Sequence, residues 1–361
     1  MAKVLLLGGT GAIGVYLIPE LISLGFEVTV TSRSARTSDH KSLTYLQGDA
    51  HEDTFIQKTV ADKYDAIVDF MVYSTSEFRR KHEWFLQNTE HYIFTSSSRV
   101  FAESHLPITE KTDRLLDVSE DSDYLTTDEY ALAKARQEDI LRESPYQNWT
   151  IVRPTITYSK TRFQLGTLEA NTILFRSQYH CPVILPQEML QKQATMTWGG
   201  DVAKMMSRLV LIRDAFCEDF NAVTHEHHTW EEMAQYYQEL IGLTVVPTSL
   251  EDYIKTVGGK YQILHSRMYH RVMDNSKILK ITGIQKENLT SVYDGLKREL
   301  SDYAQSRELM KPNYVMNARM DRMTHSRISL EKASVKEKLL YYSAYFGVYE
   351  FLKKGKNMIM K

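Results

Sequence analysis

The stretch Val4-Leu5-Leu6-Leu7-Gly8-Gly9-Thr10-Gly11-Ala12-Ile13-Gly14 decides the fold of this chain. Its first four residues form a short, wholly apolar run, which is typical of a parallel strand buried on both faces. Apolar residues then recur at helical spacing from Val15 to Ile22, and Gly25 marks the end of that helix. The sequence therefore predicts a strand, a tight glycine turn and a helix, in that order.

This glycine turn is suited to binding a dinucleotide. Glycines let the backbone approach a pyrophosphate, and the start of the following helix offers free N–H groups and a positive dipole end. The alternative is a glycine-rich turn without a ligand, which the flanking strand and helix disfavour. We therefore predict cofactor contacts from Gly8, Thr10, Gly11, Ala12, Ile13 and Gly14.

The second predicted strand, Phe26 to Thr31, is followed by Ser32-Arg33. Many NAD enzymes place an acidic residue here, which binds the 2′-hydroxyl of the adenosine ribose. A guanidinium pairs with a 2′-phosphate instead, so Arg33 favours NADP(H) over NAD(H). The alternative is an Arg33 that stacks on the adenine or points to solvent. Asp49, after the next apolar stretch, is predicted to lie beside the adenine amino group.

Tyr130 and Lys134 lie four residues apart in a helix predicted from Asp128 to Glu143. Positions i and i+4 share one face of a helix. An ammonium one turn away stabilises the phenolate form of a tyrosine. Such a tyrosine can exchange a proton near neutral pH, as hydride transfer to or from a carbonyl carbon requires.

Strand and helix patterns alternate up to about residue 160. Further strands are predicted at Ala66 to Met71, His91 to Ser96 and Trp149 to Val152, and a helix at Glu77 to Asn88. This alternation predicts an α/β fold with a Rossmann-like, doubly wound parallel sheet. The segment Glu103 to Thr127 is polar and acidic, and we expect a long connection there.

Four motifs occur together: the glycines at 8, 11 and 14, Thr95-Ser96-Ser97-Ser98-Arg99-Val100-Phe101, Tyr130-x-x-x-Lys134 and Arg153-Pro154. With them the chain resembles the extended short-chain dehydrogenase/reductases, also called the NAD-dependent epimerase/dehydratase family. The resemblance implies that Tyr130 is the acid/base and that Lys134 supports it and binds the nicotinamide ribose. It implies that Ser97 orients the substrate oxygen; the alternative is a polar strand end that satisfies local backbone groups.

The chain also departs from the family pattern. Val100-Phe101-Ala102 stands where the family usually has Val-Tyr-Gly. Ser98-Arg99 stands where the sugar-nucleotide 4,6-dehydratases of the family usually carry an Asp-Glu pair. A cationic side chain cannot act as the general base of an elimination, so dehydration is disfavoured.

Beyond about residue 160 the resemblance implies a smaller C-terminal lobe over the substrate. We therefore expect a dinucleotide-binding domain at 1–160, to which part of 190–225 returns, a substrate lobe mainly at 161–310 and a basic helical extension at 311–361. Arg162 and Arg267 are the preferred candidates for binding a phosphorylated sugar or nucleotide sugar. The alternative for each is an arginine on a solvated face.

Composition narrows the function classes. A net charge of −2 gives no nucleic-acid signature, and the two cysteines, neither of them in a Cys-x-x-Cys pair, indicate no disulfide scaffold. No apolar run approaches the ~20 residues of a membrane-spanning helix. The spacing in His225-Glu226-His227-His228 is too cramped to favour a metal, and a helix start at Thr229 is the simpler interpretation. We expect a cytoplasmic protein without a metal site.

The C-terminal segment is basic: residues 311–361 carry 11 Lys plus Arg and 4 Asp plus Glu. A helix is predicted from Ser329 to Leu352, followed by Lys353-Lys354-Gly355-Lys356. A basic helix with aromatic residues either docks on its own body or on a partner subunit, or lies on an anionic bilayer. In the last case the protein would be peripheral to the inner face of the membrane.

Three hypotheses for the function follow. The first is an NADPH-dependent reductase that acts on a keto group of a nucleotide sugar or sugar phosphate. The second is a nucleotide-sugar epimerase that keeps its cofactor tightly bound. The third is a dinucleotide-binding interaction protein without catalysis. The family resemblance further implies a homodimer and a role in polysaccharide biosynthesis at the cell surface.

Overall fold

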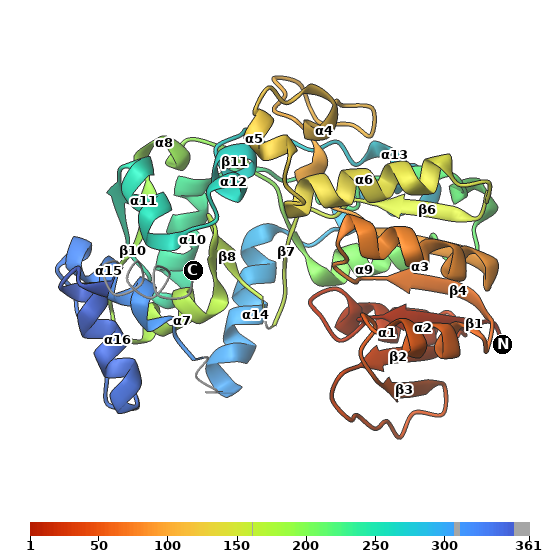
Figure 1. Cartoon of the computed structure of the whole chain (residues 1–361), viewed down its shortest axis with the longest axis horizontal. Helices are drawn as coiled ribbons and strands as arrows, with labels where there is room; N and C mark the ends of the chain where they lie inside the picture. Colours follow the sequence, from red (N-terminus) through yellow and green to blue (C-terminus); the bar gives the residue numbers. More distant parts are fainter. Residues whose placement is uncertain (161, 307–310, 350–361) are drawn as a thin grey trace, which may run out of the picture. The chain divides into compact units, whose positions relative to one another are not determined.

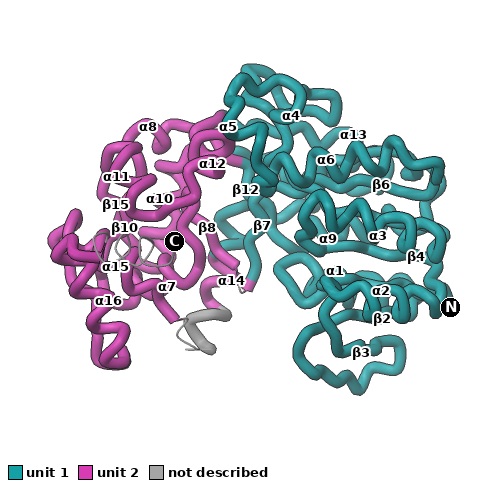
Figure 2. The backbone as a smooth tube through the Cα atoms, in the orientation of Figure 1, with its two compact units in different colours: residues 1–159, 195–227, 270–296 teal, residues 160–194, 228–269, 297–361 magenta. Residues whose placement is uncertain are grey.

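The computed structural model describes residues 1–160, 162–306 and 311–349; for residues 302–306 it describes the backbone alone. The described chain divides into two compact units (Figure 2). Unit 1 comprises Met1–Ser159, Thr195–His227 and His270–Leu296. Unit 2 comprises Lys160–Ala194, His228–Tyr269 and the chain from Lys297 onward. Each unit is therefore assembled from segments that are far apart in the sequence.

Unit 1 is built on a seven-stranded sheet with the order β13-β6-β5-β4-β1-β2-β3. All its neighbouring strands pair in parallel, and Figure 1 shows β6, β4, β1, β2 and β3 following one another across the unit. The chain runs from β1 outward to β2 and β3, then returns to β4 and continues in the other direction. The order thus reverses between β1 and β4. The strands are β1 (Lys3–Leu7), β2 (Glu27–Ser32), β3 (Leu43–Gln47), β4 (Tyr64–Asp69), β5 (Thr89–Thr95), β6 (Trp149–Val152) and β13 (Glu218–Phe220).

Helices cover both faces of this sheet, because alternate strand residues point to opposite sides. Val4 and Leu6 of β1 pack in one apolar cluster with α1 and α9, whereas Leu5 and Leu7 pack in another with α2, α3 and α6. The predicted doubly wound α/β fold is confirmed. The helices of unit 1 are α1 (Gly14–Ser23), α2 (Asp53–Val60), α3 (Thr75–Gln87), α4 (Leu115–Val118), α5 (Ser122–Leu125), α6 (Tyr130–Glu143), α9 (Gly199–Ser207) and α13 (Ser276–Thr282).

Most predicted elements of unit 1 are present with small shifts at their ends. Strand β6 has the predicted bounds, whereas β4 ends at Asp69, two residues before the predicted end at Met71. The predicted strand is too long because Phe70 and Met71 are apolar and continue the strand pattern. In the structure they lie beyond the end of β4 and are partly buried. The polar connection from 103 to 127 contains the short helices α4 and α5. A parallel two-stranded pair, β7 (Ile156–Tyr158) with β12 (Met196–Trp198), completes unit 1.

Unit 2 combines short strand pairs with helices. Its parallel pair is β10 (Val183–Pro186) with β15 (Val245–Thr248), and its antiparallel pairs are β8 (Gln164–Leu165) with β9 (Leu168–Glu169) and β11 (Gln193–Ala194) with β14 (His228–Thr229). The predicted helix start at Thr229 is confirmed by a capping box with Glu232. Its helices are α7 (Ala170–Gln178), α8 (Gln187–Leu190), α10 (Trp230–Ile241), α11 (Leu250–Val257), α12 (Lys260–Gln262), α15 (Tyr314–Thr324) and α16 (Val335–Tyr345); α14 (Val292–Ser306) passes from unit 1 into unit 2.

The described C-terminal segment forms two helices that pack on each other, α15 and α16, where one was predicted. The predicted helix from Ser329 to Leu352 is wrong at its start, because Ser334 and Glu337 form a capping box that begins α16 at Val335. It is also wrong at its end, because α16 ends at Tyr345 and a turn with Gly347 at a φ of +78° follows; the last predicted residues and the lysine cluster at 353–356 lie outside the described residues. The Tyr341 hydroxyl donates to Asp321 of α15 at 2.6 Å, so α16 docks on its own unit. None of the described helices has the length and apolarity that a membrane crossing requires.

Candidate functional site

The glycine turn lies at the carboxyl end of β1, where the strand order of the sheet reverses. The Gly8 N–H donates to the Thr31 hydroxyl of β2 at 3.0 Å, which fixes the turn against the neighbouring strand. In parallel sheets, ligands bind in the crevice outside the carboxyl ends of strands at such a reversal. The turn is therefore at the place where a dinucleotide would bind.

Two glycines of the turn disfavour a side chain, Gly8 through its backbone conformation and Gly14 through a clash with the backbone. Gly8 has a φ of +69°, and a Cβ on it would lie 2.9 Å from the Met71 sulfur. A Cβ on Gly14 would lie 2.1 Å from the Gly9 carbonyl oxygen. Among the described residues no side chain caps α1, and at its start the Val15 and Tyr16 N–H groups donate to the Gly11 and Ile13 carbonyl oxygens at 3.2 and 3.0 Å. The bare cradle and the uncapped helix fit a dinucleotide pyrophosphate.

The Lys134 side chain reaches the backbone just after β4, the strand next to β1 in the sheet. Lys134 lies in the first turns of α6, its side chain is 2% exposed, and its Nζ donates to the Met71 carbonyl oxygen at 3.0 Å. The ammonium also lies over the Phe94 ring of β5, 4.4 Å from its centroid. Burial lowers the pKa of Lys134 to about 8, and the carboxylates of Asp69 and Glu138 oppose that shift.

Asp69 holds the backbone that Lys134 contacts. Its carboxylate ends β4, is fully buried, and accepts from the Met71 N–H at 2.8 Å and from the Tyr92 hydroxyl at 2.7 Å. The Met71 peptide thus accepts from Lys134 on one side and donates to Asp69 on the other. Burial raises the pKa of Asp69 to about 6, against the hydrogen bond from Tyr92 and the charge of Lys134.

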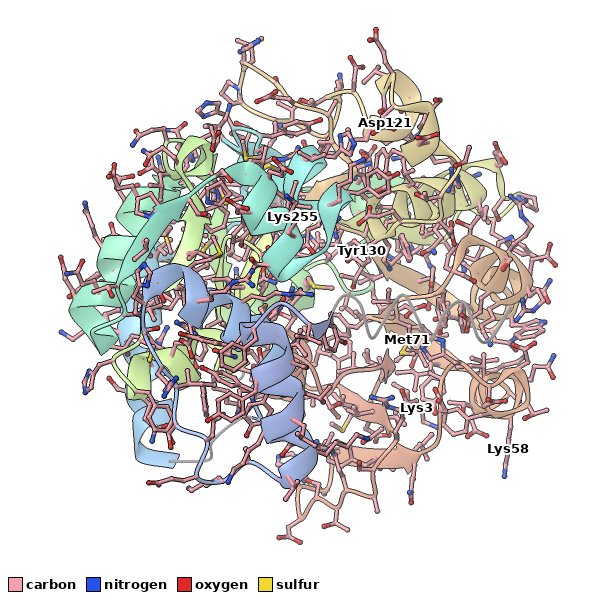
Figure 3. All side chains as sticks on the ribbon, turned by 60° about the vertical axis from the view of Figure 1, so that its left-hand side comes forward. Lys3, Lys58, Met71, Asp121, Tyr130 and Lys255 are labelled. Carbon is pink, nitrogen blue, oxygen red and sulfur yellow. The ribbon has the colours of Figure 1, made fainter. Side chains whose placement is uncertain are left out.

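Tyr130 is the first residue of α6 and is half-buried (Figure 3). The helix is capped by Glu129, which accepts from the Ala131 N–H at 2.8 Å and forms an ion pair with Arg99. The Arg99 guanidinium in turn lies over the Tyr130 ring, 5.1 Å from its centroid. One carboxylate thus fixes both the start of the helix and a cation beside the tyrosine.

The three serines after β5 have different surroundings. Ser96 donates to the buried Glu138 carboxylate at 2.6 Å, so its hydroxyl is engaged inside the protein. The Ser97 hydroxyl accepts from the Arg99 N–H at 3.2 Å, and the backbone N–H of Ser98 donates to the Pro154 carbonyl. The Ser97 hydroxyl thus satisfies a local backbone N–H, as the alternative of a polar strand end expects, and its role in orienting the substrate oxygen stays a prediction.

Comparison with known proteins agrees with this geometry. Residues 8–178 match the model of a family described as NAD(P)H-binding, whereas none of the curated proteins matches the chain. The UDP-glucuronic acid 4-epimerase of Bacillus cereus superposes with a TM-score of 0.65 at 15% identity, over 85% of this chain and 100% of its own. The UDP-glucose 4-epimerase of Thermus thermophilus gives a TM-score of 0.64 at 17% identity, over the same shares of the two chains.

The fold is that of an extended short-chain dehydrogenase/reductase. The resemblance seen in the sequence is confirmed for the fold, and residues 8–178 match the NAD(P)H-binding family model. Both epimerases are covered along their whole length, so the likeness extends beyond the cofactor domain to the fold as a whole.

The residues predicted to bind the adenosine half of the cofactor lie beside β2 and β3. Arg33 directly follows β2 and its side chain is exposed, while its carbonyl oxygen accepts from Gln47 at 3.3 Å. Asp49 follows β3 and is half-buried, with its carboxylate accepting from the His51 N–H at 3.0 Å. The roles of Arg33 and Asp49 in cofactor binding stay predictions.

The two arginines predicted to bind substrate belong to unit 2, and they differ. Arg162 is exposed. Arg267 is 5% exposed and donates to the Gly166 carbonyl oxygen at 2.9 Å and to the Gln164 side-chain oxygen at 3.1 Å. These bonds give Arg267 a structural role within unit 2, so Arg162 is the more accessible of the two.

Sequence reasoning missed Asp69, Met71 and Glu129, and it assigned no contact to Arg99. An aspartate at the end of an apolar strand was a usable signal, because a carboxylate there is buried only for a reason. Met71 carried no signal, since it acts through its backbone. Arg99 was noticed only as a departure from the dehydratases, and its position over Tyr130 follows from the cap at Glu129.

Proposed function

We propose that this protein is an NAD(P)-dependent enzyme that transfers hydride at a hydroxyl or keto carbon of a nucleotide sugar or sugar phosphate. The observation that supports it most is Lys134. Lys134 is a buried cation whose single hydrogen bond, among the described residues, goes to the carbonyl of Met71, a residue that adjoins Gly8. It lies one helical turn from Tyr130. A purely structural buried cation would be fully paired.

The nicotinamide, when bound, accepts or supplies hydride at the reacting sugar carbon. Tyr130 exchanges the proton of the sugar oxygen with its phenol group. Lys134 supplies positive charge that favours the phenolate and, released from the Met71 carbonyl, has donors for a ribose hydroxyl. The Ser97 hydroxyl donates to the sugar oxygen and fixes its direction, while the Glu129–Arg99 pair holds Tyr130 at the start of α6.

The test is Tyr130→Phe, assayed with a panel of nucleotide sugars and both cofactors. Removal of a general acid/base lowers turnover by ~10²–10⁴-fold. Cofactor binding, followed by reduced-nicotinamide fluorescence, should stay within about twofold of wild type, because the phenol does not form the glycine cradle. Wild-type turnover in this variant would show that Tyr130 is not the acid/base, whereas a wild-type protein that binds the cofactor and turns over none of these substrates would favour the non-catalytic interaction protein.

The cofactor preference rests on Arg33. Its exposed guanidinium at the end of β2 can pair with a 2′-phosphate, and no carboxylate stands at that position to repel one. Arg33→Ala should weaken NADPH by about tenfold or more and leave NADH nearly unchanged. Equal losses for both cofactors would place Arg33 on the adenine, and no loss for either would place it in solvent.

Two reaction outcomes are consistent with this site. Arg33 favours NADP(H), and NADPH is the cofactor that usually supplies hydride for reductions in the cell. Arg33 therefore favours an NADPH-dependent reductase. A nucleotide-sugar epimerase is favoured by the fold, since the Bacillus cereus and Thermus thermophilus proteins are UDP-sugar 4-epimerases. Cofactor stoichiometry decides between them: the reductase consumes one NADPH per product, whereas the epimerase consumes none over many turnovers.

A further inference from the structure

Helix α16 carries an exposed apolar stripe on the face opposite its docking contact. Val335, Leu339, Tyr342 and Phe346 are 76%, 67%, 40% and 69% exposed. Their spacing of four, three and four residues places them on one side of a helix. Tyr341 and Ala344, by contrast, are buried against the rest of unit 2 in one apolar cluster. The stripe is thus not the surface that holds α16 in place.

The clustering of these side chains separates them from ordinary surface hydrophobics. Among the described residues of unit 2, the exposed large hydrophobic side chains all lie between 335 and 348, whereas those of unit 1 are scattered over separate elements. Single exposed hydrophobics need no explanation, but a contiguous row on one helix indicates an interaction surface.

Lysines flank the stripe on both sides. Lys336 and Lys338 lie one and three residues after Val335, which puts them about 100° around the helix on one side and about 60° on the other. Lysines at the edges of an apolar stripe suit a bilayer interface, where their stems lie along the acyl boundary and their ammonium groups reach the lipid phosphates.

The same charges disfavour a second copy of the chain on this stripe. Helix pairs use oppositely charged side chains beside the apolar seam, and two copies of α16 would bring lysines together at both edges.

The sequence that follows the described residues adds four lysines and one glutamate between 350 and 361. Positive charge therefore accumulates around and after the stripe, which complements an anionic surface.

We propose that the stripe on α16 binds the surface of an anionic lipid bilayer. The apolar side chains enter the acyl boundary, while Lys336 and Lys338 pair with lipid phosphates. The bound state leaves the docking of α16 on α15 intact, because the Tyr341–Asp321 hydrogen bond lies on the other face. This inference is independent of the proposed catalytic activity.

The experiment is co-sedimentation of the full chain with vesicles of phosphatidylcholine alone or with one third phosphatidylglycerol. Wild type should sediment with the anionic vesicles and much less with the zwitterionic ones, and high salt should release it. The double variant Leu339→Glu/Phe346→Glu should partition at least about tenfold more weakly. Lys338→Gln alone should lose about fivefold.

Leu106→Glu is the matched control, since Leu106 is an equally exposed leucine, 75% exposed, in unit 1. It should partition like wild type, and all variants should keep the wild-type melting temperature. The proposal is overturned if the double variant sediments as well as wild type, or if wild type ignores anionic vesicles. It is equally overturned if wild type self-associates without lipid and the double variant does not, because the stripe would then be a protein contact.

Discussion

Two buried cations, one in each unit, show how differently this chain treats positive charge. Arg176 on α7 is 0% exposed and donates to the Pro182 carbonyl at 2.7 Å, to the Asn317 side chain at 3.1 Å and to the Asp321 carboxylate at 3.0 Å. Lys134 on α6 is 2% exposed, yet its ammonium makes one hydrogen bond, to the Met71 carbonyl. The first is fully paired, whereas the second keeps donors free within the described structure.

The difference separates a structural charge from one available for chemistry. A buried ion pair is worth its desolvation only when its remaining donors and acceptors are satisfied, as they are around Arg176. An under-paired cation costs stability, which is reflected in the lowered pKa of Lys134, and such perturbed groups cluster at functional sites. The four predictions below test this contrast.

The largest effect is expected for Arg176→Met. The substitution leaves the buried Asp321 carboxylate without its cation, which should lower the free energy of unfolding by about 3–5 kcal/mol in denaturant titrations. Adding Asp321→Asn removes the orphaned charge, so the double variant should recover part of the loss. A single variant with wild-type stability would contradict the assigned role of Arg176.

The second prediction concerns pH. The pKa of Lys134 is about 8 in the folded chain and 10.5 in its reference state, so between these values the unfolded chain binds more protons. The free energy of unfolding, measured relative to Lys134→Met, should be flat below pH 8 and rise by up to ~3 kcal/mol towards pH 10.5. A flat difference over this window would mean that Lys134 is not buried as described.

The third prediction is the activity of Lys134→Met near pH 7. Turnover should fall by ~10²-fold or more, because the phenol loses its charged partner. The melting temperature should not fall as it does for Arg176→Met, since methionine fills similar space and removes an under-paired charge. Lost activity together with a comparable loss of stability would instead make Lys134 a second structural cation.

The smallest effect is expected for Asp69→Asn. The Asp69 carboxylate raises the pKa of Lys134, so its neutral replacement lets Lys134 lose its proton earlier. The alkaline limb of the kcat/KM profile should move to lower pH by about one unit. Asp65→Asn, at the other end of β4, is the control and should leave the limb in place. An unmoved limb in both would show that Asp69 does not act on Lys134.

The sequence was informative where local patterns determine structure. The apolar run before Gly8 and the helical spacing after Gly14 predicted β1 and α1, because a strand buried on both faces and an amphipathic helix have distinct periods. The four-residue spacing of Tyr130 and Lys134 likewise placed both on α6. A glycine is needed at position 14 for a reason that the sequence did not predict, since a side chain there would meet the Gly9 carbonyl oxygen.

Other features depend on contacts that are distant in sequence. Arg267 was chosen as a phosphate ligand from its residue type, but its bond to Gly166 spans 101 positions and carries no local signal. The contact between Lys134 and the Met71 backbone was equally invisible, because a carbonyl belongs to any residue. In the C-terminal segment the apolar spacing was continuous, and only the Ser334–Glu337 cap stopped the helix from starting earlier.

The way the two units share the chain has a consequence for synthesis on the ribosome. Unit 1 requires residues up to 296, and Arg176 of unit 2 stays without its carboxylate until Asp321 has been made. No N-terminal fragment ending before residue 296 contains either unit complete. The nascent protein can therefore complete unit 1 only after residue 296 and the Arg176–Asp321 ion pair only after residue 321, and protection by chaperones matters during that interval.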